Sequence, residues 1–244
     1  MASKSRFSGK IALVTGAGRG IGRETAQALY EQGAKVIALD IVEEFLQNLK
    51  ISYPEISTVR VNLADWKSTK ETIEGLPTVD LLVNNAGLLK LGPMLDMTEE
   101  DISLHLDVNL KGYLNVAQVV ARQLIAEKRK GTFVNVASVA ANKPFVGAGA
   151  YCISKSAVQM LTEVLACELG PQGIRVNGIN PGCVSTDMLQ LYGEKGIQKS
   201  IERTPIGRVG EISEVVNGIL FLLSDESSYI NGHSLVLDGG LLKN

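Results

Sequence analysis

The chain has 244 residues, of which 45% are hydrophobic and 20% charged, and its formal net charge is −2. This size and apolar content fit one globular domain with a large core, and the charge balance provides no basic surface for nucleic acid or anionic membrane. No apolar run is long enough for a membrane span or a signal-peptide core, so we expect a cytoplasmic protein. Cys152, Cys167 and Cys183 have neither metal-ligand nor disulfide spacing, so we expect no metal site.

The N-terminal part of the chain has a dinucleotide-binding pattern. We expect residues 1–8 to be a mobile tail and residues 9–244 to be one domain. An apolar run at 11–14 precedes a glycine cluster, then a helical pattern, and then an apolar run at 36–39 that ends at Asp40. A strand, glycine turn, helix and strand in about thirty residues are the context that such a site requires. Gly16, Gly18, Gly20 and Gly22 would let the backbone approach a pyrophosphate at the helix N-terminus.

The rest of the chain alternates between expected strands and helices. Strands are expected at 58–61, 80–84, 132–138, 175–179 and 234–237, and helices at 67–74, 99–107, 110–128, 150–169 and 212–223. This alternation predicts an α/β fold, a single Rossmann-type doubly wound parallel sheet of about seven strands with helices on both faces. Residues 185–207 show no clean period, and a long irregular segment of this kind predicts a substrate lid.

Three residues in the second half of the chain suggest proton-transfer chemistry. Tyr151 and Lys155 are four residues apart on an expected helix, so the phenol and the ammonium project to the same side. We expect the ammonium to lower the pKa of the tyrosine from its usual value of about 10. Ser138, at the end of the preceding strand, can hydrogen-bond the same substrate oxygen. Together they could protonate a carbonyl oxygen, although a Y-x-x-x-K spacing alone also occurs by chance.

The conjunction of motifs resembles the short-chain dehydrogenase/reductase family. T-G-x-x-x-G-x-G begins at Thr15, Asn84-Asn85-Ala86-Gly87 follows, and Asn109, Ser138, Tyr151, Lys155 and Pro181-Gly182 complete the set in the family's order. The resemblance covers essentially the whole chain. Within the family, the segments 61–66, 79–87, 168–177 and 215–225 are similar to dicarbonyl/L-xylulose reductases and related tetrameric carbonyl reductases.

The resemblance implies hydride transfer between a nicotinamide cofactor and a small carbonyl compound or secondary alcohol. Tyr151 would be the general acid and base, Lys155 would lower its pKa and hold the nicotinamide ribose, and Ser138 would orient the substrate oxygen, so Ser138 and Tyr151 are the expected substrate contacts. Asn109 would hold a helix kink and a proton-relay water, with a helix cap as the alternative. The expected cofactor contacts are Gly16, Arg19, Gly20, Ile21, Gly22, Asp40, Asn62, Leu63, Asn85, Tyr151, Lys155, Val184 and Thr186.

The residue that ends the second strand predicts the choice of cofactor. A carboxylate at Asp40 would accept hydrogen bonds from the ribose hydroxyls of NAD(H) and would repel the 2′-phosphate of NADP(H). NADP-using relatives have a small hydroxyl residue followed by arginine there, whereas this chain has Asp40 followed by Ile41. Arg19 and the habit of the similar subfamily favour NADP(H). We give the aspartate more weight and expect NAD(H). Asn62 stands where an aspartate commonly accepts from the adenine amino group.

The sequence leaves the substrate open. Residues 140–149 should line the pocket, and apart from Asn142 and Lys143 they are mainly apolar or small and lack the histidine that sugar-reducing relatives place before the tyrosine. Small dicarbonyls, apolar ketones and secondary alcohols stay possible, as does a 3-oxoacyl or apolar-alcohol dehydrogenase. A non-catalytic cofactor-binding protein and a nucleotide-sugar epimerase are disfavoured, because the serine and tyrosine are present and the chain is short.

The resemblance also implies a homotetramer. The helices expected at 110–128 and 150–169 have apolar residues on more than one face, which is typical of buried helices. In this family such helices pair across a twofold axis, and the alternative is that neighbouring helices of the same chain cover them. The apolar residues concerned are Val116, Val119, Val120, Leu124, Val158, Leu161, Val164 and Leu165.

Overall fold

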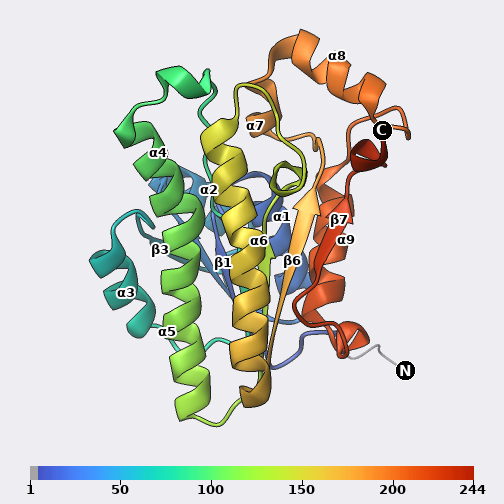
Figure 1. Ribbon diagram of the computed structural model, residues 1–244. Helices are drawn as coiled ribbons and strands as arrows, with labels where there is room; N and C mark the ends of the chain where they lie inside the picture. The colour runs from blue at the N-terminus through green and yellow to red at the C-terminus, as the bar shows by residue number, and fades with distance from the viewer. Residues whose placement is uncertain (1–4) are drawn as a thin grey trace.

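The computed structural model describes residues 5–244, and in this part of the chain seven parallel strands form one sheet with helices on both faces (Figure 1). The strand order is β3-β2-β1-β4-β5-β6-β7, so the predicted fold class is confirmed. The strands are β1 (Ile11–Thr15), β2 (Lys35–Asp40), β3 (Ser57–Arg60), β4 (Leu81–Asn84), β5 (Gly131–Val136), β6 (Ile174–Pro181) and β7 (Ser234–Leu237).

Two layers of helices enclose the sheet because alternate strand residues face opposite sides. Ala12 and Val14 join the core cluster beneath one layer, whereas Leu13 joins the cluster beneath the other. The first layer contains α1 (Gly20–Glu31), α2 (Glu43–Ser52) and α9 (Ile212–Leu223). The second contains α3 (Trp66–Glu74), α4 (Glu99–Leu106), α5 (Gly112–Ala126) and α6 (Gly149–Leu169). No helix formed by residues 5–244 has both the length and the apolar character needed to cross a membrane.

Local signals place the helix ends. The Asp65 carboxylate accepts a hydrogen bond from the Ser68 amide at the start of α3, and the Thr98 hydroxyl does the same for Asp101 at the start of α4. A π-helical turn, Asp107–Lys111, joins α4 directly to α5, so the two helices expected at 99–107 and 110–128 form one interrupted rod.

The segment 185–207 differs from the irregular structure predicted for it. It contains two helices, α7 (Asp187–Gln190) and α8 (Gly193–Arg203), which lie at the edge of the molecule where the arrow of β6 ends (Figure 1). Helix α8 has no fully buried residue, and Ile197 and Ile201 are its only large apolar residues. Two apolar positions are too few to identify a helix from the sequence pattern. The predicted lid function of this segment stays a prediction.

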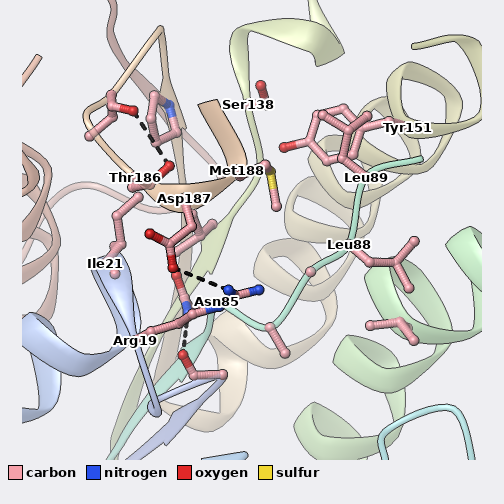
Figure 2. Close-up of a pocket in the computed structure, with 18 of the residues that line it drawn as sticks. Arg19, Ile21, Asn85, Leu88, Leu89, Ser138, Tyr151, Thr186, Asp187 and Met188 are labelled. Atoms are coloured by element: carbon pink, nitrogen blue, oxygen red, sulfur yellow. Dashed lines mark hydrogen bonds and ion pairs between the residues drawn. The ribbon is translucent and has the colours of Figure 1, made fainter. Parts of the chain in front are cut away.

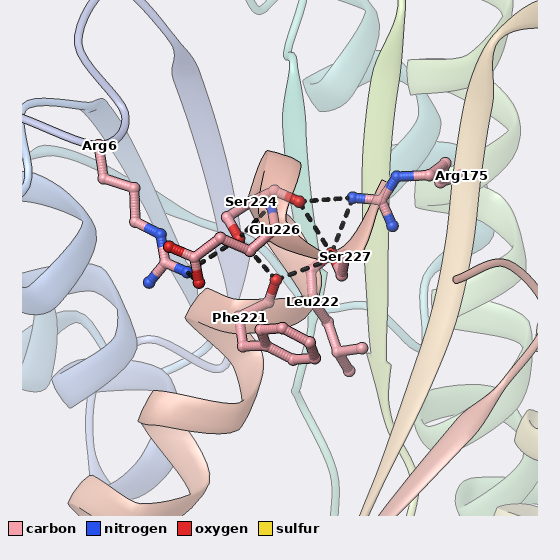
Figure 3. A network of polar contacts seen from close by, with 7 residues as sticks. All are labelled: Arg6, Arg175, Phe221, Leu222, Ser224, Glu226 and Ser227. Atoms are coloured by element: carbon pink, nitrogen blue, oxygen red, sulfur yellow. Dashed lines mark hydrogen bonds and ion pairs between the residues drawn. The ribbon is translucent and has the colours of Figure 1, made fainter. Parts of the chain in front are cut away.

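The described part of the predicted tail is packed against the domain, contrary to expectation. Residues 1–4 lie outside the described residues, but the Phe7 side chain is only 3% exposed and its amide donates to the Gln32 carbonyl. Arg6 donates to the Ser224 hydroxyl at 2.9 Å and pairs with Glu226 at 2.6 Å (Figure 3). Apolar burial of Phe7 and these polar contacts therefore hold Arg6 and Phe7 against the domain.

The same network closes the C-terminal end of α9. The last carbonyls of a helix have no partner within it. Here the Arg175 guanidinium donates to the Leu222 and Ser224 carbonyls, each at 3.0 Å, and the Ser227 hydroxyl lies within 3.0 Å of three carbonyl oxygens (Figure 3). The loop that follows α9 is thereby held against β6.

Most of the apolar residues cited for oligomerisation are covered by the chain itself. Six of them are buried in the core and Leu161 packs against it, so the alternative interpretation is correct for these seven: Val116, Val119, Val120, Leu124, Val158, Leu161 and Leu165. Val164 is 43% exposed and lies on one side of α6 with Ile153 (52%) and Met160 (58%). These three positions follow a spacing of seven and four residues, which keeps them on one helix face.

Candidate active site

A cavity of about 620 Å³ opens where the carboxyl ends of the strands meet α7 and α8. Side chains from distant parts of the sequence converge on it, with the hydroxyls of Ser138 and Tyr151 close to Met188 and with Arg19 beside Asp187 (Figure 2). Of the residues predicted for the site, Gly22 and Asn109 do not line the cavity. Those that line it are Gly16, Arg19, Gly20, Ile21, Asp40, Asn62, Leu63, Asn85, Ser138, Tyr151, Lys155, Val184 and Thr186.

The glycine turn between β1 and α1 is held by backbone contacts that leave no room for side chains. Gly16 has φ +63°, and a Cβ there would lie 2.7 Å from the Ala86 Cα. A Cβ on Gly22 would overlap the Gly16 carbonyl oxygen and the Asn85 side-chain amide. Glycine is therefore required at both positions for steric reasons, and Gly22 acts through the shape of the turn.

Asn85 clamps this turn from the neighbouring strand. Its side-chain amide donates to the carbonyls of Thr15 at 3.0 Å and Gly16 at 3.1 Å. In return, the Thr15 hydroxyl accepts from the backbone amides of Asn85 and Ala86. Asn85 was predicted as a cofactor contact, and its amide hydrogens are engaged in holding the turn. Thr15 was named from the sequence only as part of the glycine motif, with no role of its own. Its position at the end of the first strand could have indicated that role.

The end of β2 carries the predicted ribose site. The Asp40 carboxylate accepts from the backbone amides of Gly18 at 2.8 Å and Val42 at 3.0 Å, one to each oxygen. A carboxylate oxygen can accept more than one hydrogen bond, so both retain capacity toward the cavity. A Cβ on Gly18 would lie 2.8 Å from Asp40 Oδ2, and so Gly18, absent from the expected contacts, determines how Asp40 is held.

Arg19 and Asn62 have partners within the protein. The Arg19 guanidinium pairs with Asp187 at 3.1 Å and lies 5.5 Å from the centre of the Phe45 ring. Both charged groups are more than half exposed, so this ion pair is weak. The Asn62 side-chain oxygen accepts from the Ala64 amide at 3.1 Å, while Leu63 is buried. Thr186 extends the cavity wall from the start of α7, with its methyl group 3.8 Å from where a Gly20 Cβ would lie.

The environment of Tyr151 differs from expectation in one respect. Burial raises the pKa of the Tyr151 phenol well above its usual value, and the neighbouring Ser138 hydroxyl only partly opposes this. The prediction that Lys155 lowers the pKa of this phenol is therefore wrong for the protein alone, because desolvation of the phenolate dominates. The Lys155 ammonium lies 5.7 Å from the centre of the Tyr151 ring and is directed at other acceptors. Tyr151 thus holds its proton at neutral pH.

Lys155 is buried and held by neutral oxygens. Its Nζ atom donates to the Val136 carbonyl at 2.8 Å and to the Tyr113 hydroxyl at 3.3 Å, and that hydroxyl donates to the same carbonyl at 3.2 Å. Burial without a carboxylate partner lowers the pKa of Lys155 to about 7. Sequence reasoning missed Tyr113. Its spacing of four residues from Asn109 was the signal, because it places both on one side of the rod.

Asn109 lies in the π-helical turn and supports the site from behind. Its side-chain oxygen accepts from the Leu88 amide at 2.9 Å, and its amide donates to the Leu88 carbonyl at 3.1 Å and the Ser154 hydroxyl at 2.9 Å. The helix-cap alternative is wrong, because the residue lies inside the rod of α4 and α5. π turns of this kind often mark functional sites.

The described residues 5–244 bring no three His, Cys, Asp or Glu side chains together as metal ligands. The site combines four features of one class of enzyme. They are a parallel sheet, a glycine turn at the point where the strand order reverses, an acid at the end of β2, and a serine, a tyrosine and a lysine in one cavity. Together they define a nicotinamide-dependent oxidoreductase.

Comparisons with known proteins agree with this class. The family model described as "Enoyl-(Acyl carrier protein) reductase" matches residues 16–242. L-xylulose reductase of Bos taurus is 44% identical over 97% of this chain and 98% of its own, and D-erythrulose reductase of Gallus gallus is 45% identical over 97% of each. Among solved structures, a gluconate 5-dehydrogenase from Burkholderia cenocepacia in complex with NADP and tartrate has a TM-score of 0.92 at 32% identity. The match covers 99% of this chain and 98% of the dehydrogenase chain.

The chain belongs to the short-chain dehydrogenase/reductase family. It is an oxidoreductase that acts on CH–OH and C=O groups with a nicotinamide cofactor. The predicted family and the predicted similarity to the L-xylulose and carbonyl reductases are confirmed.

Proposed function

We propose that Tyr151 is the general acid for reduction of a small carbonyl compound, with Ser138 orienting the carbonyl oxygen. The observation that carries this proposal is the buried phenol beside the serine hydroxyl in the cavity, with a raised pKa that keeps its proton in place. A bound nicotinamide supplies the hydride in reduction and accepts it in oxidation. General acid catalysis of this kind contributes typically 10²–10⁴-fold to the rate.

The remaining predicted residues support this reaction. Lys155, fixed by Val136 and Tyr113, binds the nicotinamide ribose beside the phenol. Asn109 orders the segment beside Lys155 and supports proton supply. The glycine turn has the shape of a pyrophosphate cradle. A side chain on Gly16 or Gly22 would overlap neighbouring atoms of the turn and of the segment beside it, so only glycine lets the backbone take this shape. Gly20, Ile21, Leu63, Val184 and Thr186 line the remaining cofactor surface.

The test is a screen of carbonyl compounds and secondary alcohols with both nicotinamide cofactors, followed by absorbance of the reduced cofactor. Tyr151→Phe should lower kcat by at least a hundredfold while cofactor affinity, measured by fluorescence, changes little. The phenyl ring preserves the packing and removes the transferable proton. Retention of more than about a hundredth of the activity would contradict the acid role.

NAD(H) is the proposed preferred cofactor. The Asp40 carboxylate is held by two backbone amides at the ribose end of the cavity, and Arg19 is directed toward Asp187 and Phe45. A 2′-phosphate would meet a fixed negative charge there, which outweighs one exposed arginine. The names of some relatives favour NADP(H), including "Carbonyl reductase [NADPH] 2" of Sus scrofa at 42% identity. Equal or better kcat/KM with NADPH would overturn this proposal.

A 3-oxoacyl reductase is the second candidate. The apolar wall of the cavity suits an acyl chain, and a relative named "3-oxoacyl-[acyl-carrier-protein] reductase FabG" from Thermotoga maritima is 39% identical over 97% of this chain and 99% of its own. A 3-oxoacyl thioester that is reduced faster than simple ketones would favour this candidate. A purely cofactor-binding protein is disfavoured by the intact group of Ser138, Tyr151 and Lys155.

The assembly proposed is a homotetramer in the cytoplasm. The exposed apolar side chains Ile153, Met160 and Val164 form a face on α6 that a second copy would cover. A monomeric mass by light scattering at micromolar concentration would contradict it. The helices α7 and α8 are proposed to act as the lid, since Met188, Leu189 and Tyr192 line the cavity from that side.

A further inference from the structure

We infer, resting on the function proposed above, that the substrate is an uncharged ketone or secondary alcohol with hydrocarbon substituents, and not a sugar or a sugar acid. The inference comes from the half of the cavity around Tyr151. Three observations carry it: the apolar packing around the phenol, the engagement elsewhere of the polar side chains in residues 140–149, and the absence of free charge among the described cavity residues at this end.

The phenol of Tyr151 lies within an apolar cluster. It packs with Ala140 and Ala148, and the partly buried side chains against this cluster are Leu89, Leu91, Phe145, Cys152 and Met188. Figure 2 shows Met188 beside the hydroxyls of Ser138 and Tyr151, and Leu89 belongs to the side chains packed against the Tyr151 cluster. A carbonyl oxygen bonded to those hydroxyls would therefore have its substituents against hydrocarbon. Each methylene buried there should raise kcat/KM about fourfold.

The polar side chains of residues 140–149 face away from the cavity. The Lys143 ammonium donates to the carbonyl oxygens of Leu241 at 3.4 Å and Asn244 at 2.6 Å, at the end of the chain. Asn142 donates to the Gln159 side-chain oxygen at 3.1 Å and accepts from the Asn180 amide at 2.7 Å. Neither lines the cavity, whereas Ala140 and Phe145 from the same segment do. This segment thus presents hydrocarbon to the substrate.

The charged residues that line the cavity have other partners. Arg19 and Asp187 pair with each other, Asp40 lies at the ribose end, and Lys155 is bound to Val136 and Tyr113. A sugar carboxylate would find no free cation among the described residues at the substrate end. Burial without a pair would oppose its ionised form.

Hydroxyl groups of a sugar would also be poorly matched. Beyond Ser138 and Tyr151, the hydroxyls on the described lining are those of Tyr192, Thr186 and Ser200. Ser200 donates to the Gly196 carbonyl of its own helix and Thr186 lies near the glycine turn. Of these three residues, Tyr192 is therefore the one whose hydroxyl stays available to a substrate, and it lies near enough to Tyr151 to raise the pKa of that phenol further. Each buried substrate hydroxyl left unpaired should lower kcat/KM roughly 5- to 150-fold.

A matched substrate series tests the inference on the full-length enzyme. The ketones are 2-butanone, 2-pentanone and 2-hexanone, and the polar counterparts are erythrulose, with the four-carbon skeleton and C2 carbonyl of 2-butanone, and 5-ketogluconate. We expect kcat/KM to rise about fourfold per added methylene. We expect erythrulose to be at least about fivefold poorer than its skeleton match 2-butanone, and 5-ketogluconate to be poorer still. A flat ketone series, or erythrulose equal to or better than 2-butanone, would overturn the inference.

A variant pair ties the result to the cavity. Met188→Gln keeps the length of the side chain and adds a polar group, so it should flatten the chain-length dependence and narrow the gap to erythrulose. The control is Ile51→Gln on α2, which is 78% exposed and outside the cavity lining and should change neither. Turnover of polar ketoses above apolar ketones would refute the substrate class and leave the proposed reaction standing. No turnover of any ketone, alcohol or ketose with either cofactor would refute the proposed reaction, and the inference with it.

Discussion

The two halves of the cavity are built in different ways. At the cofactor end, backbone atoms form the surface: the glycine turn after β1 is clamped by Asn85, and Asp40 is held by two amides. At the substrate end, side chains from α7, α8 and residues 140–149 form it, with Phe145 and Met188 against Tyr151. Backbone packing leaves little freedom for substitution, whereas a wall of side chains can change one residue at a time.

The two ends should therefore respond differently to substitution. At the cofactor end of this chain, a Cβ on Gly16 or Gly22 would lie less than 3.0 Å from neighbouring atoms, so glycine is required there independently of the substrate. The substrate end depends on which side chains happen to face the phenol. Tyr151 and Lys155 lie at the boundary between the two halves, and substitutions there should have the largest effect.

Lys155→Met should have the largest combined effect, on activity and on stability. We expect kcat/KM to fall by at least a hundredfold and cofactor affinity to fall with it, because the proposed function uses the Lys155 ammonium in both turnover and cofactor binding. The free energy of unfolding of the Lys155→Met variant should instead increase. Burial lowers the pKa of Lys155 to about 7 from an ordinary value of 10.5, so the unfolded chain binds more protons between these two values.

The stability of the unmodified enzyme should therefore rise with pH from about 7 to 10.5, and the full penalty of the buried ammonium should be present below pH 7. Removing the amine should stabilise the fold at pH 6 by up to about 5 kcal/mol, and this gain should shrink to a small fraction of that value by pH 10. Thermal unfolding at both pH values measures this. Lys50→Met, at an exposed position on α2, is the control. An equal stability gain at pH 6 and pH 10 would contradict the mechanism.

Gly22→Ala should damage the cofactor end alone. Its Cβ would overlap the Gly16 carbonyl oxygen and the Asn85 amide, and overpacking of this kind costs typically 1–3 kcal/mol. We expect cofactor affinity to fall at least tenfold and Tm to drop. Gly75→Ala is the matched control, because Gly75 has φ −78° and its Cβ would meet only ordinary contacts. Cofactor affinity that is unchanged in Gly22→Ala as well as in Gly75→Ala would contradict the prediction, because the turn would then have accommodated the added Cβ.

The sequence predicted the cofactor end better than the substrate end for a physical reason. A strand, a glycine turn and Asp40 are local features that share about thirty residues, and the strands around them show clear apolar runs. The helix α2 was missed although Phe45, Leu46 and Leu49 have helical spacing. The contacts of Lys143 with the chain end and of Tyr113 with Lys155 join residues 98 and 42 positions apart, and only the fold brings them together.

The raised pKa of Tyr151 could not be predicted from spacing. The four-residue separation from Lys155 placed both groups in one cavity, as expected. Whether the ammonium or the surrounding hydrocarbon dominates depends on burial, which Leu89, Phe145 and Met188 provide from three separate segments. Desolvation opposes the charged form of both groups.

Asp40→Ser tests whether charge at the cofactor end selects the nucleotide. Removing the carboxylate should improve the ratio of NADPH to NADH efficiency by about tenfold to a hundredfold, because the 2′-phosphate no longer meets a like charge. Asp40→Asn separates charge from shape, since its amide keeps one acceptor for the Gly18 or Val42 amide. Both variants should shift the ratio in the same direction. A ratio unchanged in both would mean that Arg19, and not Asp40, decides the choice.

Tyr113→Phe should have the smallest effect on activity. It tests whether the Tyr113 hydroxyl helps to hold Lys155 between the two halves of the cavity. The variant keeps the ring, whose centre lies 5.1 Å from the Lys155 ammonium, and removes the hydroxyl that accepts from it. Lys155 would keep the Val136 carbonyl as an acceptor, so we expect kcat/KM to fall about threefold to tenfold, in line with loss of one hydrogen bond of about 1 kcal/mol.

The pH dependence distinguishes positioning from packing in this variant. The groups that face the Tyr113 hydroxyl are the Lys155 ammonium, the Val136 carbonyl and the Tyr151 phenol. Burial raises the pKa of Tyr113, and the charged form of the Tyr151 phenol would raise it further. Loss of an acceptor disfavours the ammonium, so the pKa of Lys155 should fall further and the activity that depends on it should decline at lower pH than in the unmodified enzyme. Phe133→Leu, a buried ring in the core beneath α5 that does not line the cavity, should lower Tm without moving the profile. A Tyr113→Phe profile that overlays that of the unmodified enzyme, with only Tm reduced, would show that the hydroxyl serves the fold and not the lysine.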